Sequence, residues 1–180
     1  MKNSNLKTID YCTTALCAAV IAILAQITIP MPVGIPITLQ TFGIAITAIL
    51  LGKKRGTSAV LIYLLLGGIG IPVFHNFTGG IQSFWGPTGG FLLSFPALSW
   101  IIGYGTEKYS SSKTSFFFCL LTGTAFTLLC GMLFFSMLTG TSLMSAFTTC
   151  VLPFLPTTIL QMVLAAVVGL RLRKRLIFIL

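Results

Sequence analysis

Long apolar runs, separated by short polar breaks or by breaks rich in glycine and proline, dominate the pattern of residues along the chain. A helix needs roughly 20 apolar residues to cross the hydrocarbon core of a bilayer. Six runs approach or exceed this length, and they cover residues 12–29, 37–51, 57–71, 89–104, 116–138 and 151–170. The pattern predicts an all-α integral membrane protein in which residues 1–180 form one domain of six transmembrane helices.

The second and third runs are short for a membrane span, at about 15 residues each. Prolines lie beside them, at Pro30, Pro32 and Pro36 before the second run and at Pro72 after the third. Proline removes a backbone donor and disfavours a continuing helix. Irregular backbone at membrane depth is tolerated where it lines a cavity. We therefore expect helices that stop early on one side of the membrane, around a cavity.

The basic residues predict which side this is. All 11 Lys and Arg residues fall in alternate segments between the runs. They are Lys2, Lys7, Lys53, Lys54, Arg55, Lys108, Lys113, Arg171, Arg173, Lys174 and Arg175. Short loops rich in Lys and Arg stay in the cytoplasm. This predicts that both termini are cytoplasmic and that the short, proline-interrupted helix ends face outward.

Composition excludes the soluble classes. The chain is 56% hydrophobic and only 7% charged, whereas a soluble domain carries about 25% charged residues. The net charge of +9 does not indicate a nucleic-acid partner, because the basic residues lie between apolar runs rather than on a solvated polar face. The remaining partner for such a surface is the lipid membrane.

The inventory of catalytic groups is small. Asp10 and Glu107 are the only carboxylates, and both fall on the predicted cytoplasmic side. His75 is the single histidine, and the five cysteines contain no C-x-x-C pair. This set provides neither a paired-carboxylate site nor a metal site of ordinary spacing. We predict no enzymatic activity, no bound metal and no cofactor.

Neutral polar residues gather instead near the predicted outer helix ends and in the segment between the third and fourth runs. They are Gln26, Thr28, Thr38, Gln40, His75, Asn76, Thr78, Gln82, Ser83, Trp85 and Thr88. Aromatic residues such as Phe74, Phe77 and Phe84 are interleaved with them. Apolar walls with a few hydrogen-bonding groups are typical of a small-molecule site. The alternative is that these residues mark the membrane interface.

Helix polarity favours an anionic ligand on that side. The second, fourth and sixth predicted helices begin at the outer face, after residues 36–38, 86–90 and 153–158. The partial positive charge and free N–H groups of a helix N-terminus can hold an anion without a cationic side chain. A small amphipathic anion would suit this face, although the polarity alone does not choose a substrate.

Several ordered motifs resemble those of a known family. Residues 25–41 read AQITIPMPVGIPITLQT, and residues 50–56 read LLGKKRG. Residues 63–74 read YLLLGGIGIPVF, followed by GPTGGF at 86–91 and PFLP at 153–156. This set is similar to the BioY family, the biotin-binding S components of energy-coupling-factor (ECF) vitamin transporters.

The resemblance implies a multi-pass protein of the bacterial inner membrane that captures biotin from outside. It also implies partners, namely a transmembrane coupling subunit and two ATPase subunits. The alternatives are an S component for another small vitamin-like substrate and a structural membrane subunit that transports nothing.

The expected ligand site combines the outer residues with the family motifs. Its residues are Gln40, Phe74, Asn76, Pro87, Thr88, Gly89, Gly90, Phe91, Thr158 and Gln161, with His75 in the same loop. Gly89 and Gly90 lack a Cβ, so we expect ligand and backbone to approach closely there.

The chain departs from the family pattern at one place. Family members usually carry Asp and, three residues later, Lys after the last PFLP motif, where this chain has Thr158 and Gln161. Residues three apart share a helix face, so both side chains should face the pocket. Two neutral groups there would give weaker hydrogen bonds than an ionic pair, unless the substrate differs too.

The first helix carries small residues at spacings that allow close helix contact. Ala15, Ala19 and Ala22 form such a face, and small-xxx-small faces let helices approach closely in lipid. Resemblance to S components implies that this face contacts the coupling subunit. Packing inside the six-helix bundle is the alternative.

Overall fold

The computed structural model describes residues 2–31, 35–109 and 113–177, and only the backbone of residues 2–7, 113, 176 and 177. The described chain is mostly helical, which confirms the predicted class. The long helices are α1 (Lys2–Ala25), α2 (Gln40–Gly68), α4 (Gly89–Tyr109), α5 (Lys113–Thr139) and α7 (Phe154–Ile177). The short elements are β1 (Thr28–Ile29), β2 (Ile37–Thr38), η1 (His75–Phe77), α3 (Gln82–Trp85) and α6 (Leu143–Cys150).

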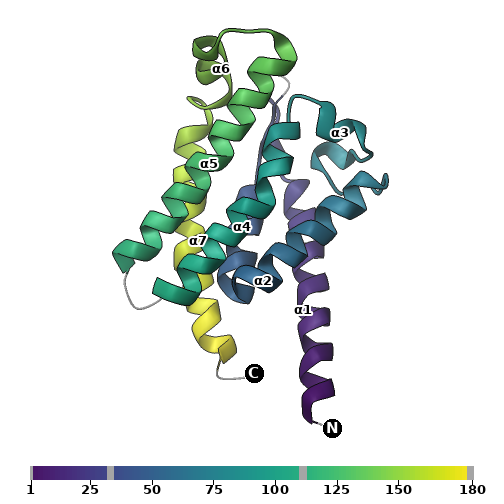
Figure 1. The fold of residues 1–180 in the computed structure, drawn as a ribbon, viewed down its shortest axis with the longest axis vertical. Helices are drawn as coiled ribbons and strands as arrows, with labels where there is room; N and C mark the ends of the chain where they lie inside the picture. Colours follow the sequence, from purple (N-terminus) through teal and green to yellow (C-terminus); the bar gives the residue numbers. More distant parts are fainter. Residues whose placement is uncertain (1, 32–34, 110–112, 178–180) are drawn as a thin grey trace.

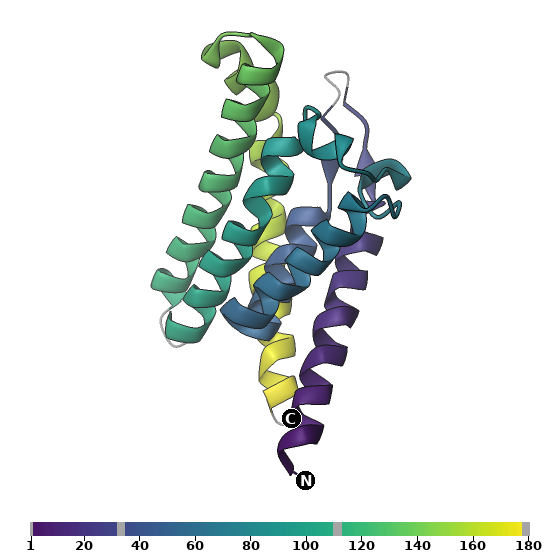
Figure 2. The ribbon, with the colours of Figure 1, turned by 45° about the vertical axis from the view of Figure 1, so that its right-hand side comes forward.

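The elements are arranged with two different ends. Both chain termini, the bend of α2, the end of α4 and the start of α5 lie at one end (Figure 1). The short elements α3 and α6 lie toward the opposite end, and the view turned by 45° shows the same arrangement (Figure 2). The structure therefore brings the described basic segments to one end, as the alternating charge pattern predicts. The side chains of Lys2, Lys7 and Lys113 lie outside the described residues.

Helix α2 is two helical segments joined at Gly52. This glycine has φ 76° and ψ −175°, a backbone conformation that side chains with a Cβ rarely adopt. The two segments pack closely, since a Cβ on Gly56 would lie 3.0 Å from the Cα of Ala48. The break between the second and third runs is therefore where the sequence predicts it.

The predicted loop at this break is wrong in extent. Because Gly52 alone accommodates the reversal, the helix resumes at once, and Lys53, Lys54 and Arg55 are helical rather than in a loop. The first free N–H of the new segment, that of Lys53, donates to Glu107 Oε1 at 2.9 Å. The carboxylate also lies 3.5 Å from Lys53 Nζ. Glu107 thus stabilises the bend from α4.

The predicted first and second spans are also wrong at their outer ends. Helix α1 ends at Ala25, and Thr28 and Ile29 pair antiparallel with Thr38 and Ile37. The prolines explain the change, because a residue before proline is biased toward extended backbone and a proline cannot donate within a helix. Pro32 lies outside the described residues.

Two smaller boundary differences concern the third and sixth runs. Helix α2 ends at Gly68 rather than at residue 71, and α7 begins at Phe154 rather than at residue 151. The short helix α6 precedes α7, and none of the six runs predicts it. Its N-cap is Ser142, whose hydroxyl accepts from the N–H of Ser145.

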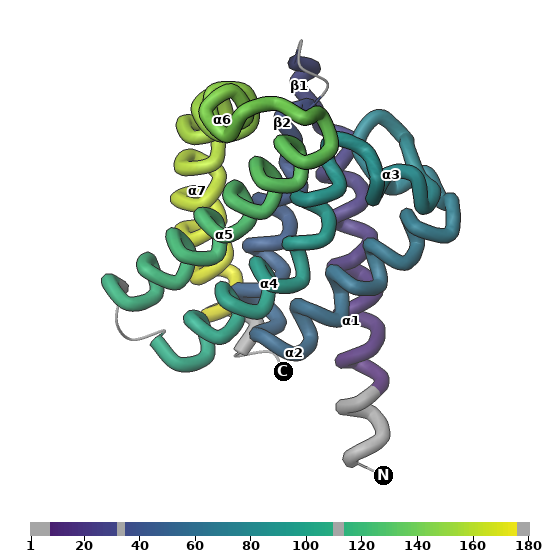
Figure 3. The backbone as a smooth tube through the Cα atoms, turned by 45° about the horizontal axis from the view of Figure 1, so that its top comes forward, coloured from purple at the N-terminus to yellow at the C-terminus, as the bar shows by residue number. Residues whose placement is uncertain are grey.

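Helix α2 forms the centre of the molecule. It packs against α1, α4 and α7, and α4 packs against α5, as the tube view with its top tilted forward shows (Figure 3). Residues such as Ile44, Ile49 and Leu98 are fully buried between these helices. Large apolar residues on α5 and α7, such as Phe118 and Leu160, face outward. Exposed apolar surface of this extent fits a lipid environment.

Three helices within the described residues are long and apolar enough to cross a membrane. They are the segments Thr8–Ala25, Thr114–Thr139 and Phe154–Arg175. Helices of this length and composition indicate an integral membrane protein.

Candidate ligand-binding site

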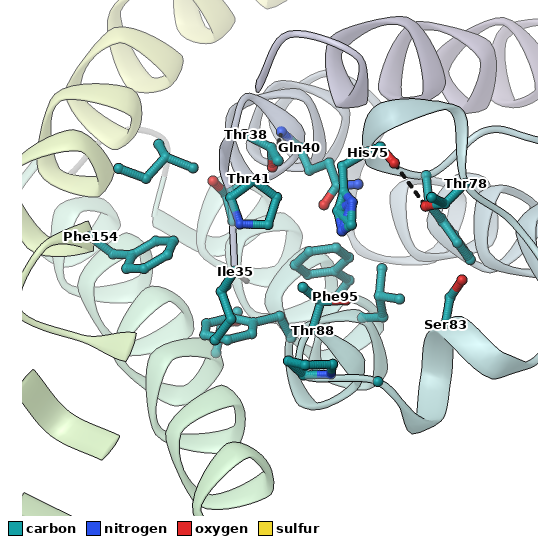
Figure 4. A pocket seen from close by; sticks show the side chains of 18 of the residues that line it. Ile35, Thr38, Gln40, Thr41, His75, Thr78, Ser83, Thr88, Phe95 and Phe154 are labelled. Atoms are coloured by element: carbon teal, nitrogen blue, oxygen red, sulfur yellow. Dashed lines mark hydrogen bonds between the residues drawn. The ribbon is translucent and has the colours of Figure 1, made fainter. Parts of the chain in front are cut away.

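A cavity of about 590 Å³ lies at the end of the molecule that carries α3 (Figure 4). Strand β2, the start of α2, the loop before α4, and helices α4, α5 and α7 all contribute to its walls. Volumes of about 300–1,000 Å³ are usual for small-molecule sites. We call the segment from Ile69 to Thr88 the cavity loop, because twelve of its residues line this space.

Seven of the ten ligand-binding residues predicted from the sequence line the cavity. They are Gln40, Phe74, Pro87, Thr88, Phe91, Thr158 and Gln161. His75 lines it as well. Residues more than 100 positions apart in the sequence therefore meet around one space, as the predicted site requires.

The other three predicted residues do not line the cavity. Asn76 is exposed and its Oδ1 accepts a hydrogen bond from Thr28 Oγ1 at 2.9 Å, which joins the cavity loop to β1. A Cβ on Gly89 would collide with the carbonyl of Phe84, and one on Gly90 with Phe134 of α5. The two glycines permit close packing of α4 on its neighbours, rather than close approach of a ligand.

Gln161 of α7 is tied to the opposite wall of the cavity. Its Nε2 donates to the carbonyl oxygen of Thr38 at 3.0 Å, and its Oε1 accepts from Thr41 Oγ1 at 2.6 Å. Thr158 lies one helical turn before it and also faces the cavity. Both are buried, with 8% of Thr158 and 7% of Gln161 exposed. Gln161 thus joins α7 to β2 and α2.

The wall formed by α2 is a buried polar and aromatic cluster. Gln40 Nε2 donates to the hydroxyl of Tyr63 at 2.8 Å. The ring of Tyr63 meets that of Phe74 edge-on at 5.5 Å, and Phe74 meets Phe84 in the same way at 5.7 Å. Gly67 makes room for Phe74, because a Cβ there would collide with its ring. The cluster fixes the first residue of the His75 turn.

Gln26, at the end of α1, holds the cavity loop in place. Its Nε2 donates to the carbonyls of Val73 and Phe74 at 3.2 and 3.0 Å, and its Oε1 accepts from the N–H of Phe77 at 2.9 Å. Asn76 and Phe77 have φ values of 53° and 54°. Left-handed backbone costs a non-glycine residue roughly 1–2 kcal/mol. The Gln26 bonds offset this cost and preserve the shape of the turn.

The sequence did not identify Gln26 as a positioning residue, nor the part of α5 that completes the cavity. Gln26 appears there only as one of several polar outer residues, and its partners are some 50 positions away. Thr124, Thr127 and Leu128 of α5 line the cavity, but they lie within an apolar run that gives no signal for a site.

Among the described residues, the cavity walls carry no fixed charge. None of the residues that line it is Lys, Arg, Asp or Glu, and His75 is the only one that titrates near neutral pH. Burial lowers the pKa of the His75 imidazole below its usual value. The arrangement provides apolar and aromatic surface with neutral hydrogen-bonding groups, and no pair of groups suited to acid–base catalysis.

An apolar helical chain with an uncharged cavity near one end of its helices has the architecture of a membrane protein suited to binding a small molecule. Comparison with known proteins identifies the family to which the chain belongs. Residues 1–178 match the BioY family, and the chain belongs to that family. The family is one of transporter components and not of enzymes.

Similar proteins and a similar solved structure cover nearly the whole chain. Biotin transporter BioY2 of Lactococcus lactis subsp. cremoris is 35% identical over 172 residues, covering 96% of this chain and 94% of that protein. Biotin transporter BioY of Thermotoga maritima is 38% identical over 159 residues, covering 87% and 90%. The crystal structure of an S-component for biotin from an ECF-type ABC transporter matches with a TM-score of 0.85 and 32% identity, covering 97% of this chain and 94% of that one.

Proposed function

We propose that this chain is the S component of an ECF transporter and that it captures biotin from outside the cell for ATP-driven import. The observation that supports this proposal is the cavity of about 590 Å³, in a chain whose relatives are named biotin transporters. The cavity is large enough for a vitamin-sized molecule. Its neutral donors and acceptors suit the polar ring of biotin, and its apolar residues suit the aliphatic chain.

The proposed topology has six spans, with both termini in the cytoplasm of a bacterium and the cavity facing outward. The alternating placement of basic residues supports it, as does their position at the end of the molecule away from the cavity. The two segments of α2 on either side of Gly52 count as the second and third spans. We assign the chain to the inner (cell) membrane on the same grounds.

The proposed partners are a transmembrane coupling subunit and two ATPase subunits. Ala15 and Ala19 are exposed on α1 and available to another membrane helix. Ala22 is half-buried and packs against the core of this chain. The docking face predicted from the sequence is therefore supported at Ala15 and Ala19, while Ala22 supports the internal-packing alternative.

Biotin binding by the purified chain tests the proposal. Mass spectrometry of the denatured protein should release biotin retained during purification, and isothermal titration of stripped protein should give one site. Uptake of labelled biotin into cells should require the ATPase partners. A chain that neither retains nor binds biotin, and supports no uptake, would sink the proposal and leave the membrane fold.

A second experiment addresses topology. The side chains of Lys54 and Gln82 are both exposed, one at each end of the molecule. Cysteines introduced there into a cysteine-free background should react differently with a probe that cannot cross membranes. The probe should modify position 82 in intact cells and position 54 only after lysis. The reverse pattern would invert the proposed orientation.

One observation favours a second candidate, an S component for a relative of biotin without a free carboxylate. Neutral Thr158 and Gln161 stand where the family carries an ionic pair, and both line the cavity. Titration of the wild-type chain with biotin and with its primary amide separates the two candidates. The amide should bind more tightly if the neutral relative is the natural substrate. A structural subunit that transports nothing should bind neither compound.

A further inference from the structure

His75 has two ring nitrogens that the protein leaves without partners. Both Nδ1 and Nε2 are buried, and neither has a hydrogen-bond partner in the structure. The large majority of buried side-chain polar atoms in proteins are hydrogen-bonded, and exceptions often mark a function or a missing partner. The ring points into the cavity in the close-up, near Gln40 and Phe95 (Figure 4). A molecule in the cavity is therefore the available partner for this imidazole.

The groups that surround His75 bring no competing charge. Besides His75, the polar residues of the cavity walls are Thr38, Gln40 and Thr41 from β2 and α2, Gln82 and Ser83 from α3, Thr78 and Thr88 from the rest of the cavity loop, Thr124 and Thr127 from α5, and Thr157, Thr158 and Gln161 from α7. All are neutral. Tyr63 lies behind the α2 wall, and its phenol hydroxyl already accepts from Gln40. The paired charges of Glu107 with Lys53 and of Asp10 with Arg55 lie at the other end of the molecule.

A carboxylate placed in such a cavity needs a counter-charge, because burial of an unpaired ion is strongly unfavourable. The walls provide no Lys or Arg. His75 is the one lining group that can become a cation near neutral pH. Its orphaned nitrogens are also hydrogen-bond donors once the ring is protonated.

We propose that His75 is the ligand-contacting residue that neutralises the carboxylate of a bound anionic vitamin, and that each binding event takes up one proton from solvent. The inference rests on the proposed function and adds to it the residue that recognises the acid group. Above its lowered pKa, the imidazole in the empty cavity is neutral. Binding of the anion brings one proton to the ring, which then forms an imidazolium–carboxylate hydrogen bond. Release of the ligand returns that proton to solvent.

The sign of the pH dependence follows from this linkage. Burial lowers the pKa of His75 in the empty cavity, and the ligand carboxylate raises it in the complex. Between those two pKa values, ligand affinity falls by about tenfold for each unit of rising pH, because one proton is bound with the ligand. Below the lower value and above the higher value, affinity is independent of pH.

Isothermal titration measures the proton directly. Biotin is titrated between pH 5.5 and 8.5 in pairs of buffers with different ionisation enthalpies, and its primary amide is the matched neutral ligand. A free aliphatic carboxyl resembles that of glutamate, whose pKa is about 4.3, so biotin stays ionised throughout. At pH values between the two pKa values of His75, we expect uptake approaching one proton for biotin, and at every pH we expect none for the amide. His75 is the single histidine, which simplifies the assignment.

The variant His75→Gln keeps hydrogen-bonding capacity but cannot take up a proton. It should bind biotin at least tenfold more weakly at pH 6 and show no proton uptake, while its affinity for the amide stays within about threefold of wild type. Thermal unfolding in detergent checks that it is folded. Since the amide reports an intact cavity, loss of biotin binding alone identifies the acid group as the partner of His75.

Two results would overturn the inference while the proposed function stands. One is biotin binding without net proton uptake in the wild type, and the other is an unchanged pH profile in His75→Gln. Equal pH dependence for biotin and the amide also excludes the carboxylate as the partner. A different outcome is that neither compound binds at any pH. That result would contradict both the proposed biotin function and the proposed role of His75.

Discussion

The side-chain amide of Gln26 donates a hydrogen bond to the carbonyl oxygen of Phe74 at 3.0 Å, across 48 positions of sequence. This contact joins the end of α1 to the cavity loop immediately before His75. The same amide group also bonds to Val73 and Phe77. One side chain thus fixes the backbone on both sides of the histidine, and α1 is coupled to the shape of the cavity.

Replacing Gln26 by Met, which has a similar volume, should release this turn. Three backbone groups of the loop would lose a partner, and each unsatisfied buried group costs about 1–3 kcal/mol when water cannot replace the partner. Partial access to water reduces that cost, so we expect roughly tenfold weaker biotin binding and a lower unfolding temperature. Titration and thermal unfolding in detergent measure both. Leu16→Met on the exposed side of α1 is the control and should change neither.

The glycines at the start of α4 give a prediction about stability. A Cβ on Gly90 would collide with Phe134 and lie 2.6 Å from the carbonyl oxygen of Cys130. Overpacking of this kind costs about 1–3 kcal/mol, or more against backbone. Gly90→Ala should therefore lower the unfolding temperature by several degrees. Gly86→Ala is the matched control, because its nearest neighbours are at 3.7 Å. Equal stability of the two variants would contradict the packing role.

Glu107 should stabilise the bend at Gly52 through its hydrogen bond more than through its charge. Its Oε1 accepts from the N–H of Lys53, whereas the ion pair with Lys53 Nζ is partly exposed and 3.5 Å long. Glu107→Gln keeps an acceptor and should lose little stability. Glu107→Ala removes it and should cost about 1 kcal/mol, the usual value of one hydrogen bond. Chemical denaturation of the two variants makes the comparison; similar losses would assign the effect to the charge.

The exposed alanines of α1 give a prediction about the partners. Ala19→Leu adds bulk on an exposed helix face, where small residues allow another helix to approach. We expect reduced co-purification with the coupling subunit and reduced biotin uptake, with unchanged binding of biotin to the isolated chain. Val20→Leu, on the neighbouring exposed position, is the control. Loss of binding by the isolated Ala19→Leu chain would point to internal packing instead.

The helices could be predicted from sequence because a membrane-spanning segment must be apolar over most of its length. The break at Gly52 was visible for the same reason, since three basic residues interrupt two apolar runs. The β1–β2 pair was not visible. Thr28, Ile29, Ile37 and Thr38 are as apolar as their helical neighbours, and only their pairing across the proline-rich turn makes them strands.

The candidate site could be predicted where a side chain faces the cavity from a regular helix. Thr158 and Gln161 share one face by their spacing, and both line the cavity. The role of Gly90 could not be predicted, because a missing Cβ indicates a close approach without identifying the neighbour. Gln26 shows the same limit, since its partners come from a loop that only the fold brings near α1.

The neutral pair on α7 allows the family's ionic pair to be restored. Thr158 and Gln161 lie one helical turn apart and line the cavity together. In the variant Thr158→Asp with Gln161→Lys, the new charges can pair with each other and bond to biotin. Hydrogen bonds to charged groups contribute about 1.5–3 kcal/mol, against about 0.5–1.5 for neutral ones. We expect the double variant to bind biotin as tightly as wild type or up to about tenfold more tightly.

The two single variants determine whether the effect comes from the pair. Thr158→Asp alone should weaken biotin binding, because a lone buried carboxylate is poorly solvated or takes up a proton, and it repels an anionic ligand. Gln161→Lys alone should favour biotin over its primary amide. It also removes the acceptor of Thr41 Oγ1. The variant should therefore be less stable than wild type, and thermal unfolding would register the loss.

Titration of the wild type and the three variants with biotin and the amide distinguishes the two candidate substrates. If biotin is the natural ligand, the double variant should keep or raise its affinity. If the natural ligand is neutral, the restored pair should weaken the amide while improving biotin, which reverses the order of affinities. A folded double variant that binds biotin more weakly than wild type would contradict direct contact between this face of α7 and the ligand. In that case Gln161 would act only through its bonds to Thr38 and Thr41, as a link between α7 and the opposite wall.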